Sequence, residues 1–394
     1  MKILHVGKFL PPSFGGMERA LQSMASGMAV RGHDVRVLVH ADGAGSGLAS
    51  QGGMEVFRAP FSAAIGSMPL SRRYLEVYRD WSRWAEIVHF HEPFPPASAA
   101  FTLLPRPRRV VVSWHSDIVR QRVLRPVAEL FQRRLCASAD RIICSTRRMR
   151  DHSRVLAPWT RKCSVIGFGI DPRPFNRALV DRGAIAAVRR AAGGRFALAV
   201  GRLVSYKGFD VLLRALVDTN VRLVIVGEGP LETELKTSCL ELGLADRVVF
   251  AGGLSDDHLR MHYAACEFLV MPSISAAETF GIVQIEAMAC GKPVINTALP
   301  TGVPEVSSHG ITGLTVPPGD AVALGAALAR LWETPALTAE LGRRARDRFE
   351  RHFLEEVVLD RLERLYDVVA VDAPAELRSR EANPMPTTES ATIV

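Results

Sequence analysis

Several common patterns are missing from this sequence of 394 residues. It has no run of 18 apolar residues, so no membrane-spanning helix is expected. Its six cysteines form no CxxC pair and lack zinc-ligand spacing, which predicts reduced, mostly buried thiols. The opening MKILHVGKFLPP lacks the apolar core and small-residue cleavage site of a signal peptide. Together these absences predict a cytoplasmic protein.

Length and composition indicate a globular protein with two domains. Hydrophobic residues make up 48% of the chain and charged residues 23%, which is typical of folded proteins and not of disordered or fibrous ones. A single hydrophobic core rarely extends beyond about 250–300 residues. We therefore expect the chain to divide into two domains of similar size.

The positive charge of the protein is concentrated in its first half. Residues 1–180 contain 27 Lys and Arg against 13 Asp and Glu, a net charge of +14, whereas the remainder carries −6. This asymmetry predicts an anionic partner, either an acidic membrane surface or a phosphorylated substrate, with a merely solvated basic surface as the alternative. Nucleic acid is not expected, because helix-turn-helix, RRM and zinc patterns are absent and the acidic second half would repel a phosphate backbone.

Short apolar runs alternate with amphipathic segments along the chain. In the first half, helical patterns at residues 17–31 and 121–137 lie among the apolar runs KILHVG, DVRVLV, EIVHFH, RRVVVSW and DRIICS. After GFGIDPRPFN, helical patterns at 209–217, 231–243, 256–265 and 281–290 lie among RFALAVG, VRLVIVG, DRVVFAG, EFLVMP and KPVIN. Such alternation is typical of βαβ units, in which helices cover both faces of a parallel sheet.

The repeated pattern predicts an α/β fold of two doubly wound, Rossmann-like domains that face a cleft. We place the N-terminal domain at residues 1–175 and the second domain at 176–354. After helices near 320–332 and 336–351, we expect a C-terminal helix at 355–370 that packs back toward the N-terminal domain, and a disordered tail at 371–394. Because open α/β sheets bind ligands at the carboxyl ends of their strands, functional residues should follow the strands directly.

Two glycines follow the first strand. Gly15 and Gly16 precede a helix and would let a bound group approach the backbone amides, although such a pair also occurs in plain loops. The dinucleotide-binding pattern GxGxxG follows none of the strands, so a dinucleotide cofactor is not expected.

Histidines and carboxylates end the next strands of the first half. His91 and Glu92, with His89, end one strand, and His115 and Asp117 follow the next. These side chains suit hydrogen bonds to a ligand or proton transfer, and the alternative is a network inside the loops. A metal site from the histidines is possible, but no HExxH-type spacing supports one, so none is expected.

In the second half, the loop after RFALAVG carries two cations. Arg202 and Lys207 lie where a diphosphate would need fixed positive charge, because the charge that develops on a leaving group must be neutralised. The alternative is a pair of solvated surface residues. After the next strand Glu228 stands between two glycines, which suits close contact with a planar base or a ribose.

The segment SISAAETFGIVQIEAMACGKPVI places Glu278 and Glu286 eight residues apart. On one helix, eight residues span about 12 Å and roughly 80° of rotation. Two carboxylates that attack one glycosidic bond are expected about 5–9.5 Å apart, so these two should have separate roles. The helix start at residues 280–283 offers free amides to a phosphate, while Glu278 suits sugar hydroxyls and Glu286 a ribose. The alternative is that Glu278 complements the helix dipole and Glu286 is a surface residue.

A set of motifs in one order resembles a known family. GRLVSYKG, VGEGP, ETFGIVQIEAMACGKPV, TGVPEV and GLTVPPGD, with SFGGMER, WHSD and GFGID before them, resemble the retaining glycosyltransferases of family 4, which have the GT-B fold. The resemblance covers about residues 1–370, and the glutamate pair matches the E-x7-E motif of the family. Two positions depart from the pattern, with Gly167-Phe168-Gly169 in place of Pro-Asn-Gly and Thr301-Gly302 in place of Gly-Gly.

The resemblance implies transfer of a sugar from a nucleotide-diphosphate donor with retention of anomeric configuration. It assigns the catalytic environment to Glu278, Arg202, Lys207 and His115, the last beside the outer hydroxyl of the sugar. It implies no required cofactor or metal, and no DxD metal-binding motif stands in a suitable place. It also implies that the leaving diphosphate itself helps to deprotonate the acceptor on the same face. The donor site that it implies consists of Gly15, Gly16, Arg202, Lys207, Glu228, Leu254, Glu278, Phe280, Gly281, Ile282, Val283 and Glu286.

The segments FLPPSFGGMER, HEPFPP and WHSDIVRQ most resemble those of bacterial transferases of O-antigen and exopolysaccharide assembly, many of them mannosyltransferases. This implies a hexose donor such as GDP-mannose, with a UDP-sugar as the alternative. The N-terminal domain would then bind a glycan or polyprenyl-diphosphate-linked acceptor, with Asp117, His91 and Glu92 as candidates.

Arginines of the N-terminal domain would rest on anionic lipid at the inner face of the cytoplasmic membrane; they are Arg72, Arg73, Arg79, Arg83 and those within 106–109 and 120–134. The rival functions are a sugar-nucleotide epimerase of the same fold and a non-catalytic subunit that keeps only the fold. An epimerase would convert a nucleotide sugar without an acceptor. The presence of Glu278, Glu286, Arg202 and Lys207 argues against a non-catalytic subunit.

Overall fold

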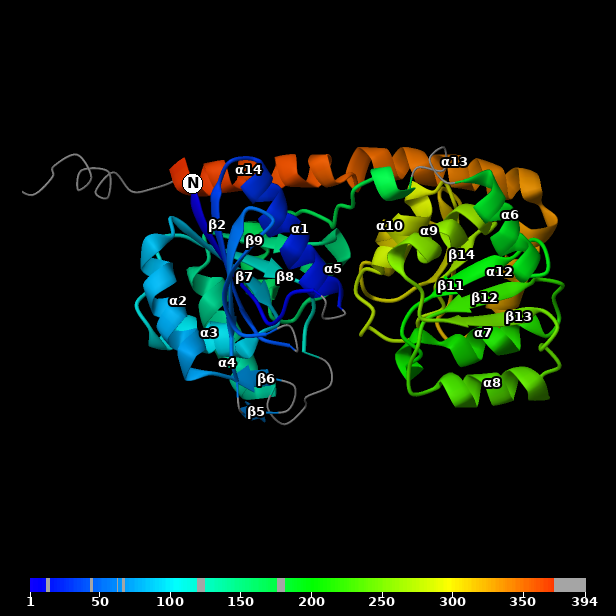
Figure 1. Ribbon diagram of the computed structural model, residues 1–394, viewed down its shortest axis with the longest axis horizontal. Helices are drawn as coiled ribbons and strands as arrows, with labels where there is room; N and C mark the ends of the chain where they lie inside the picture. Colours follow the sequence, from blue (N-terminus) through cyan, green and yellow to red (C-terminus); the bar gives the residue numbers. More distant parts are fainter. Residues whose placement is uncertain are drawn as a thin grey trace, which may run out of the picture.

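The computed structural model of the protein describes residues 1–11, 15–42, 45–61, 63–65, 68–118, 125–175 and 181–371. Two βα layered halves lie side by side, and the last two helices run across both of them (Figure 1). Part of the helix expected at 121–137, the start of the second domain at 176–180 and the tail from residue 372 lie outside the described residues.

An eight-stranded sheet forms the centre of the N-terminal half, in the order β10-β9-β8-β7-β1-β2-β4-β3. All its neighbours pair in parallel except β3, which is antiparallel to β4. The central strands are valine- and isoleucine-rich and buried on both faces, as parallel sheets require. The strands are β1 (Lys2–Val6), β2 (Asp34–His40), β3 (Gly47–Gln51), β4 (Met54–Ala59), β7 (Ile87–Glu92), β8 (Val110–Trp114), β9 (Arg141–Cys144) and β10 (Cys163–Val165).

Helices cover both faces of this sheet. A short antiparallel hairpin, β5 (Ala63–Ile65) with β6 (Met68–Leu70), stands outside it. The core of this half consists of two clusters of buried side chains, one that includes residues of α2, α3, α4 and α5 and one that includes residues of α1. The helices are α1 (Gly16–Val30), α2 (Arg72–Trp84), α3 (Pro95–Leu103), α4 (Arg125–Ser138) and α5 (Arg147–His152).

The C-terminal half is built around a six-stranded parallel sheet in the order β13-β12-β11-β14-β15-β16. Its strands are β11 (Ala197–Val200), β12 (Leu223–Val226), β13 (Val248–Gly252), β14 (Leu269–Val270), β15 (Val294–Thr297) and β16 (Gly313–Val316). Its helices are α6 (Arg182–Ala191), α7 (Phe209–Leu216), α8 (Glu232–Glu241), α9 (Asp256–Ala265), α10 (Ile282–Ala289), α11 (Val303–Val306) and α12 (Ala321–Glu333).

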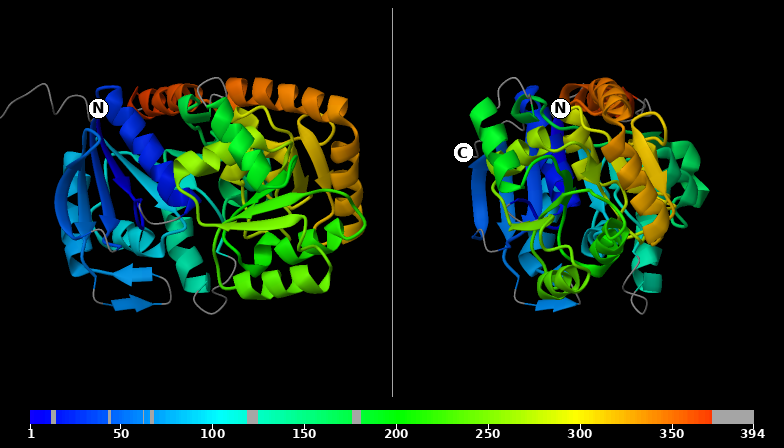
Figure 2. Two further views of the ribbon diagram at one scale, coloured as in Figure 1. Left: turned by 45° about the vertical axis from the view of Figure 1, so that its right-hand side comes forward. Right: turned by 90° about the vertical axis from the view of Figure 1, so that its right-hand side faces the viewer.

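The chain ends by returning to its first half. Helix α13 (Pro335–His352) packs on α10, and α14 (Glu355–Val371) continues across to α1, as the orange and red ribbons of Figure 2 show. Buried side chains of α14 belong to the same core cluster as β1 and β2. Arg31 on α1 donates hydrogen bonds of 2.6 Å to both Asp360 and Glu363. This helix is therefore a structural layer of the N-terminal half.

The α/β class and the two Rossmann-like sheets agree with the prediction from the sequence. The sequence did not predict strands β3 to β6, and the pairs β3–β4 and β5–β6 are antiparallel, because short connections join their strands. Helix α14 ends at Val371, one residue inside the expected tail. None of the described helices is long and apolar enough to cross a membrane.

Candidate active site

The strand order reverses at one point in each sheet. In the C-terminal sheet, β11 and β14 are neighbours whose connections lead away in opposite directions, and in the N-terminal sheet the same is true of β1 and β7. Open α/β sheets bind ligands at such switch points, beyond the carboxyl ends of the strands. The loops after these four strands are therefore where the site should lie.

The loops after β11 and β14 bring Lys207 and Glu278 together. Nζ of Lys207 lies 2.5 Å from Oε2 of Glu278, and Ser273 donates a second hydrogen bond of 3.2 Å to the same oxygen. Both side chains are largely buried. Burial alone would lower the pKa of Lys207, but the negative charge and hydrogen bond of Glu278 outweigh it and raise that pKa. Lys207 is thus held as a cation at the switch point.

Helix α10 begins directly after this loop without a side-chain cap. Its N-cap residue, Gly281, has φ 75°, and a Cβ there would lie 2.4 Å from Sδ of Met271, so only glycine fits. Within the described residues, no acceptor takes the amides of Ile282 and Val283. Free amides and the positive end of a helix dipole attract phosphate oxygens.

The first turn of α1 meets the first turn of α10. Helix α1 also lacks a side-chain cap, and a Cβ on Gly16 would lie 3.4 Å from Cδ1 of Ile282. At Gly15 a Cβ would fall 1.9 Å from Oε2 of Glu18, so the carboxylate of Glu18 folds directly over the backbone. Two uncapped helix starts, one from each half, therefore approach the same space.

Glu286 occupies a different position from Glu278. Its side chain points from α10 toward α9, where Tyr263 donates a hydrogen bond of 2.6 Å to Oε2. Arg19 reaches across from α1, with Nη1 at 3.5 Å from Oε1. Burial raises the pKa of Glu286, partly offset by the hydrogen bond from Tyr263. The two glutamates contact different partners, and Glu286 is 6% exposed, so it is not a surface residue. Their separate roles toward a ligand stay a prediction.

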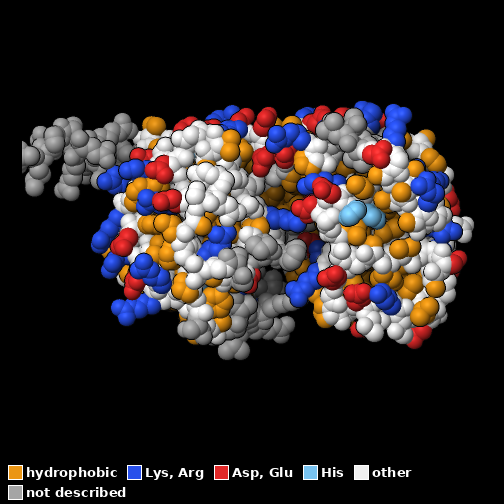
Figure 3. All heavy atoms as spheres, in the orientation of Figure 1, with side chains coloured by type: hydrophobic (Ala, Val, Ile, Leu, Met, Phe, Trp, Pro, Cys, Tyr) orange, Lys and Arg blue, Asp and Glu red, His pale blue; other side chains and the backbone are white. Residues whose placement is uncertain are grey.

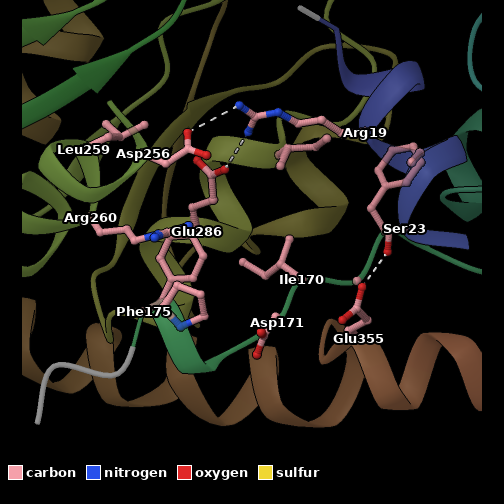
Figure 4. A pocket seen from close by; sticks show the side chains of 15 residues that line it. Arg19, Ser23, Ile170, Asp171, Phe175, Asp256, Leu259, Arg260, Glu286 and Glu355 are labelled. Carbon is pink, nitrogen blue, oxygen red and sulfur yellow. Dashed lines mark hydrogen bonds and ion pairs between the residues drawn. The ribbon is translucent and has the colours of Figure 1, made fainter. Parts of the chain in front are cut away.

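A cavity of about 230 Å³ lies between the halves beside Glu286. Figure 4 shows that Arg19 spans its mouth and contacts both Glu286 and Asp256, at 3.5 and 3.8 Å. Ser23 of α1 and Glu355 of α14 are hydrogen-bonded on the opposite side, at 2.8 Å. Side chains of both signs line this opening, and Figure 3 shows the hollow between the two halves.

The remaining predicted donor residues lie at the carboxyl edge of the C-terminal sheet. Arg202 follows β11 and is exposed, with no ion-pair partner in the described ranges. Glu228 follows β12 and accepts a hydrogen bond of 3.2 Å from the amide of Gly253. Leu254, after β13, is half-buried. The structure thus gathers the predicted donor residues along one sheet edge, and their contacts with a donor stay a prediction.

His115 ends a row of buried histidines. Nε2 of His115 lies 3.1 Å from Nδ1 of His91, and Nε2 of His91 lies 3.1 Å from Nδ1 of His5. On the other side, the ring of His115 stacks on Phe168 at 5.7 Å between centroids. Phe168 in turn contacts Phe280, which precedes α10, at 4.7 Å. The ring of Phe168 therefore lies between His115 and the residue that leads into α10.

The three residues assigned to the acceptor side are bonded to protein groups. Glu92 is 0% exposed and accepts hydrogen bonds from the Phe94 amide and from the side chains of Ser98 and Gln132. His91 is also 0% exposed.

Asp117 accepts hydrogen bonds from Trp114 (2.9 Å), Ser153 (2.6 Å) and the Arg154 amide (3.1 Å). In this conformation His91 and Glu92 offer no surface to a ligand. Their assignment to the acceptor stays a prediction.

One trio could hold a metal ion among the described residues. The ligand atoms of His5, His89 and His91 lie within 4.8 Å of one another. Both nitrogens of His89 already bond, to Tyr366 at 2.6 Å and to Ser113 at 2.8 Å. A divalent ion here would have to break these hydrogen bonds in a fully buried place, so the trio suits a hydrogen-bond network better than a metal.

Sequence reasoning missed Arg19, Tyr263, Ser273 and His5. Arg19 lies within the SFGGMER motif, next to the glycine pair, so its position in the sequence was a usable signal. Tyr263 was signalled only indirectly, because a carboxylate inside the apolar helix of Glu286 requires a hydrogen-bond partner. Nothing in the sequence marks Ser273 or His5, which join their networks through the folding of distant strands.

Comparison with known proteins agrees with this geometry. Residues 14–173 match the family model described as Glycosyltransferase Family 4, and residues 184–348 match the model of Glycosyl transferases group 1. D-rhamnosyltransferase WbpZ of Pseudomonas aeruginosa is 33% identical over 358 residues, which cover 90% of this chain and 92% of that protein. O-antigen chain mannosyltransferase C of Escherichia coli is 30% identical over 367 residues, covering 93% and 98%.

The fold is also that of solved structures. Sucrose-phosphate synthase from Thermosynechococcus elongatus superposes with a TM-score of 0.79 over 94% of this chain and 100% of that one, at 22% identity. At this level of identity the likeness concerns the fold alone. Together with the matches along the sequence, it shows that the chain is a GT-B glycosyltransferase and belongs to glycosyltransferase family 4.

Proposed function

We propose that this glycosyltransferase moves a hexose, with retention of configuration, from a nucleotide-diphosphate sugar to a glycan or polyprenyl-diphosphate-linked acceptor. The donor that we propose is GDP-mannose, and the pathway is the synthesis of a bacterial cell-surface polysaccharide such as O-antigen. The names of the two relatives support this, since one is an O-antigen mannosyltransferase and the other a D-rhamnosyltransferase.

The observation that carries the proposal is the convergence of positive groups at the switch point. The uncapped starts of α1 and α10, the cation of Lys207 and the exposed Arg202 all lie where β1, β11 and β14 end. A sugar nucleotide presents two phosphates whose charge grows as the sugar leaves, and preorganised donors of this kind stabilise that charge. Of the two helix starts, that of α10 is the freer one, because the carboxylate of Glu18 lies over the backbone at the start of α1.

Each remaining residue receives a role from its position. Glu286, beside the cavity and held by Tyr263, suits the ribose hydroxyls. Glu278 suits hydroxyls of the transferred sugar, and Glu228 and Leu254 suit the base. We propose that no metal or cofactor is required, because the side chains and amides of this chain supply the positive charge. The leaving diphosphate then accepts the proton of the attacking hydroxyl on the same face.

A thermal-shift panel of nucleotide diphosphates and their sugars tests the donor. Binding to the folded state raises the unfolding temperature by mass action. GDP and GDP-mannose should raise it in the presence of EDTA, and UDP and ADP should not. A response to UDP compounds instead favours the alternative donor, and no response to any nucleotide contradicts the donor site itself.

Two further measurements test the reaction. The anomeric configuration of the product, read by NMR, separates retention from inversion. An epimerase, the rival that shares the fold, would convert a nucleotide sugar without an acceptor. Loss of donor only when acceptor is present supports the transferase.

We also propose that the N-terminal half contacts anionic membrane. Apolar side chains are exposed on α3 and α4, with Leu103 75%, Val127 59% and Leu130 52% exposed. Such side chains beside a basic surface favour an interfacial position. Of the arginines named above, Arg72 and Arg73 pair with Glu76, and Arg79 with Asp80, which leaves them less charge to offer lipid.

The test is sedimentation with vesicles that contain phosphatidylglycerol, at low salt. Binding that requires the anionic lipid supports the proposal. Equal recovery in the supernatant with anionic and neutral vesicles contradicts it.

A further inference from the structure

Three imidazoles form a continuous hydrogen-bonded row in the N-terminal half. His5 lies on β1, His91 on β7 and His115 directly after β8, and these strands are neighbours in the sheet. The two nitrogen–nitrogen distances along the row are both 3.1 Å. His5 and His91 are 0% exposed and His115 is 7% exposed. The row therefore runs from the interior of the sheet to the ring of Phe168, which lines the cavity between the halves.

Each ring in the row carries one proton. Burial lowers the pKa of His5 to about 3 and that of His115 to about 4. Burial also lowers the pKa of His91, and the neighbouring histidines lower it further. A charged imidazolium inside a row of neutral rings would lose its hydration without gaining a counter-ion. All three rings are neutral at neutral pH.

Three protons and two hydrogen bonds leave only two consistent arrangements. Each hydrogen bond between rings uses one proton, so the third proton must lie at one end of the row. Either it lies on Nε2 of His5, or it lies on Nδ1 of His115. Nε2 of His5 is buried and has no hydrogen-bond partner among the described residues. Nδ1 of His115 is the ring nitrogen that the row does not use, and His115 is the one member of the row with any exposure, 7%.

The two ends differ in what an unpaired proton costs. A buried N–H without an acceptor forfeits its hydration and is rare in folded proteins, whereas an under-satisfied acceptor is more often tolerated. The arrangement with the proton on Nδ1 of His115 avoids the buried orphan donor at His5. In that arrangement Nε2 of His115 accepts from His91, and His91 accepts from His5.

We propose that His91 and His5 are positioning residues that fix His115 in its Nδ1–H form, so that it donates a hydrogen bond to the bound donor and does not act as a base. The inference rests on the proposed function for the identity of that ligand, an oxygen of the sugar or of its phosphate. The tautomer itself depends only on the row. Stacking on Phe168, which contacts Phe280, fixes the plane of the His115 ring beside α10.

The direct test is the ¹⁵N NMR spectrum of the full-length protein labelled at histidine, without any ligand. His115→Gln identifies the His115 signals by their loss. We expect a protonated Nδ1 and an unprotonated Nε2 for His115. A protonated Nε2 overturns the proposal, and so does a stoichiometric metal ion on the purified protein, because it would occupy the ring nitrogens. Neither result depends on which nucleotide binds.

A matched pair of substitutions at residue 91 tests the function of the row. The Asn side chain of His91→Asn can still donate an N–H to Nε2 of His115, whereas the carboxylate of His91→Asp can only accept. We expect the Asp variant to move the proton of His115 to Nε2 and to lose about tenfold or more in kcat, which corresponds to one lost hydrogen bond. The Asn variant should keep the Nδ1–H spectrum and lose less activity.

The GDP affinity of both variants, measured by thermal shift, separates this inference from the donor proposal. The proposed role of the row is supported if the Asp variant binds GDP as the wild type does, carries the His115 proton on Nε2 and has a lower kcat. Equal kcat in the Asp and Asn variants contradicts its role. If the Asp variant does not fold, the tautomer in the wild-type spectrum still decides the assignment.

Discussion

In the N-terminal half, the polar side chains at the strand ends are buried and bond to one another, whereas in the C-terminal half some of those that follow the strands are exposed. His5, His91 and Glu92 are 0% exposed and have protein partners. Arg202 and Glu228 are exposed, and the amides at the start of α10 are free. The contrast separates two tasks on one scaffold. In the N-terminal half these polar groups hydrogen-bond to other protein groups and fix side chains such as His115. In the C-terminal half several of them remain available to a ligand.

Among the substitutions considered, removal of Lys207 from the C-terminal half should reduce activity most. Lys207→Ala takes away the buried cation and leaves Glu278 without its partner, so sugar transfer should fall by about a hundredfold or more. The measurement is the initial rate of transfer, with the unfolding temperature as a check on folding. The matched control is Lys236→Ala, because Lys236 is exposed and its ion pair is with Glu232 on the same helix, α8. Full activity in Lys207→Ala would remove this residue from the site.

Acidification should lower the stability of the N-terminal half. Burial lowers the pKa of His5 to about 3 and that of His115 to about 4, and an unfolded histidine titrates near 6.5. The unfolded chain therefore binds more protons below pH 6.5. The contribution of these two histidines to the free energy of unfolding is fully present above pH 6.5 and is lost as the pH drops toward 4. At pH 5 the loss is about 2 kcal/mol for each of the two residues. The raised pKa of Glu286 acts in the opposite direction.

Urea denaturation between pH 7.5 and pH 5 measures this loss. His5→Gln should show a flatter dependence on pH than the wild type, and His258→Gln, at an exposed position of α9, should not. Identical slopes for the wild type and His5→Gln would contradict the assignment of the loss to the row.

Removal of one hydroxyl from each half should give the smallest effects and the sharpest contrast. Tyr263→Phe deletes the hydrogen bond to Glu286, so the free energy of unfolding should fall by about 1 kcal/mol and GDP binding should weaken severalfold. The hydroxyl of Tyr74 is buried without a partner in the described residues, so Tyr74→Phe should leave stability equal or slightly higher. Equal losses in the two variants would show that the bond to Glu286 contributes nothing specific.

Much of the C-terminal site could be predicted from the sequence because its residues follow strands that are themselves recognisable. Lys207 and Glu278 each stand after an apolar run, and parallel strands must bring such loops to one edge. The glycine before α10 and the apolar helix with one carboxylate were also visible. What these residues contact, Ser273 and Tyr263 among others, depended on packing between segments far apart in sequence.

The N-terminal half was less predictable for a physical reason. The pattern of EIVHFH places His89 and His91 on one face of a strand, but the sequence does not say whether that face meets solvent or another layer. It meets α14, through the bond of His89 to Tyr366, 277 residues away. Strand β3 was also missed, because GLASQ is mostly exposed and has no buried alternation.

The return of α14 to the first sheet has a consequence for the order of events during synthesis. Domains usually fold in turn as they leave the ribosome, the N-terminal one first. Here one cover of the first sheet, α14, with Leu362, Tyr366 and Val369 in the core, is made after every strand of both sheets. A nascent chain that has completed only its first half exposes an apolar face of that sheet until α14 has been made. This layer of the first half can therefore form only after the second half has been synthesised, and the exposed face is a binding surface for chaperones until then.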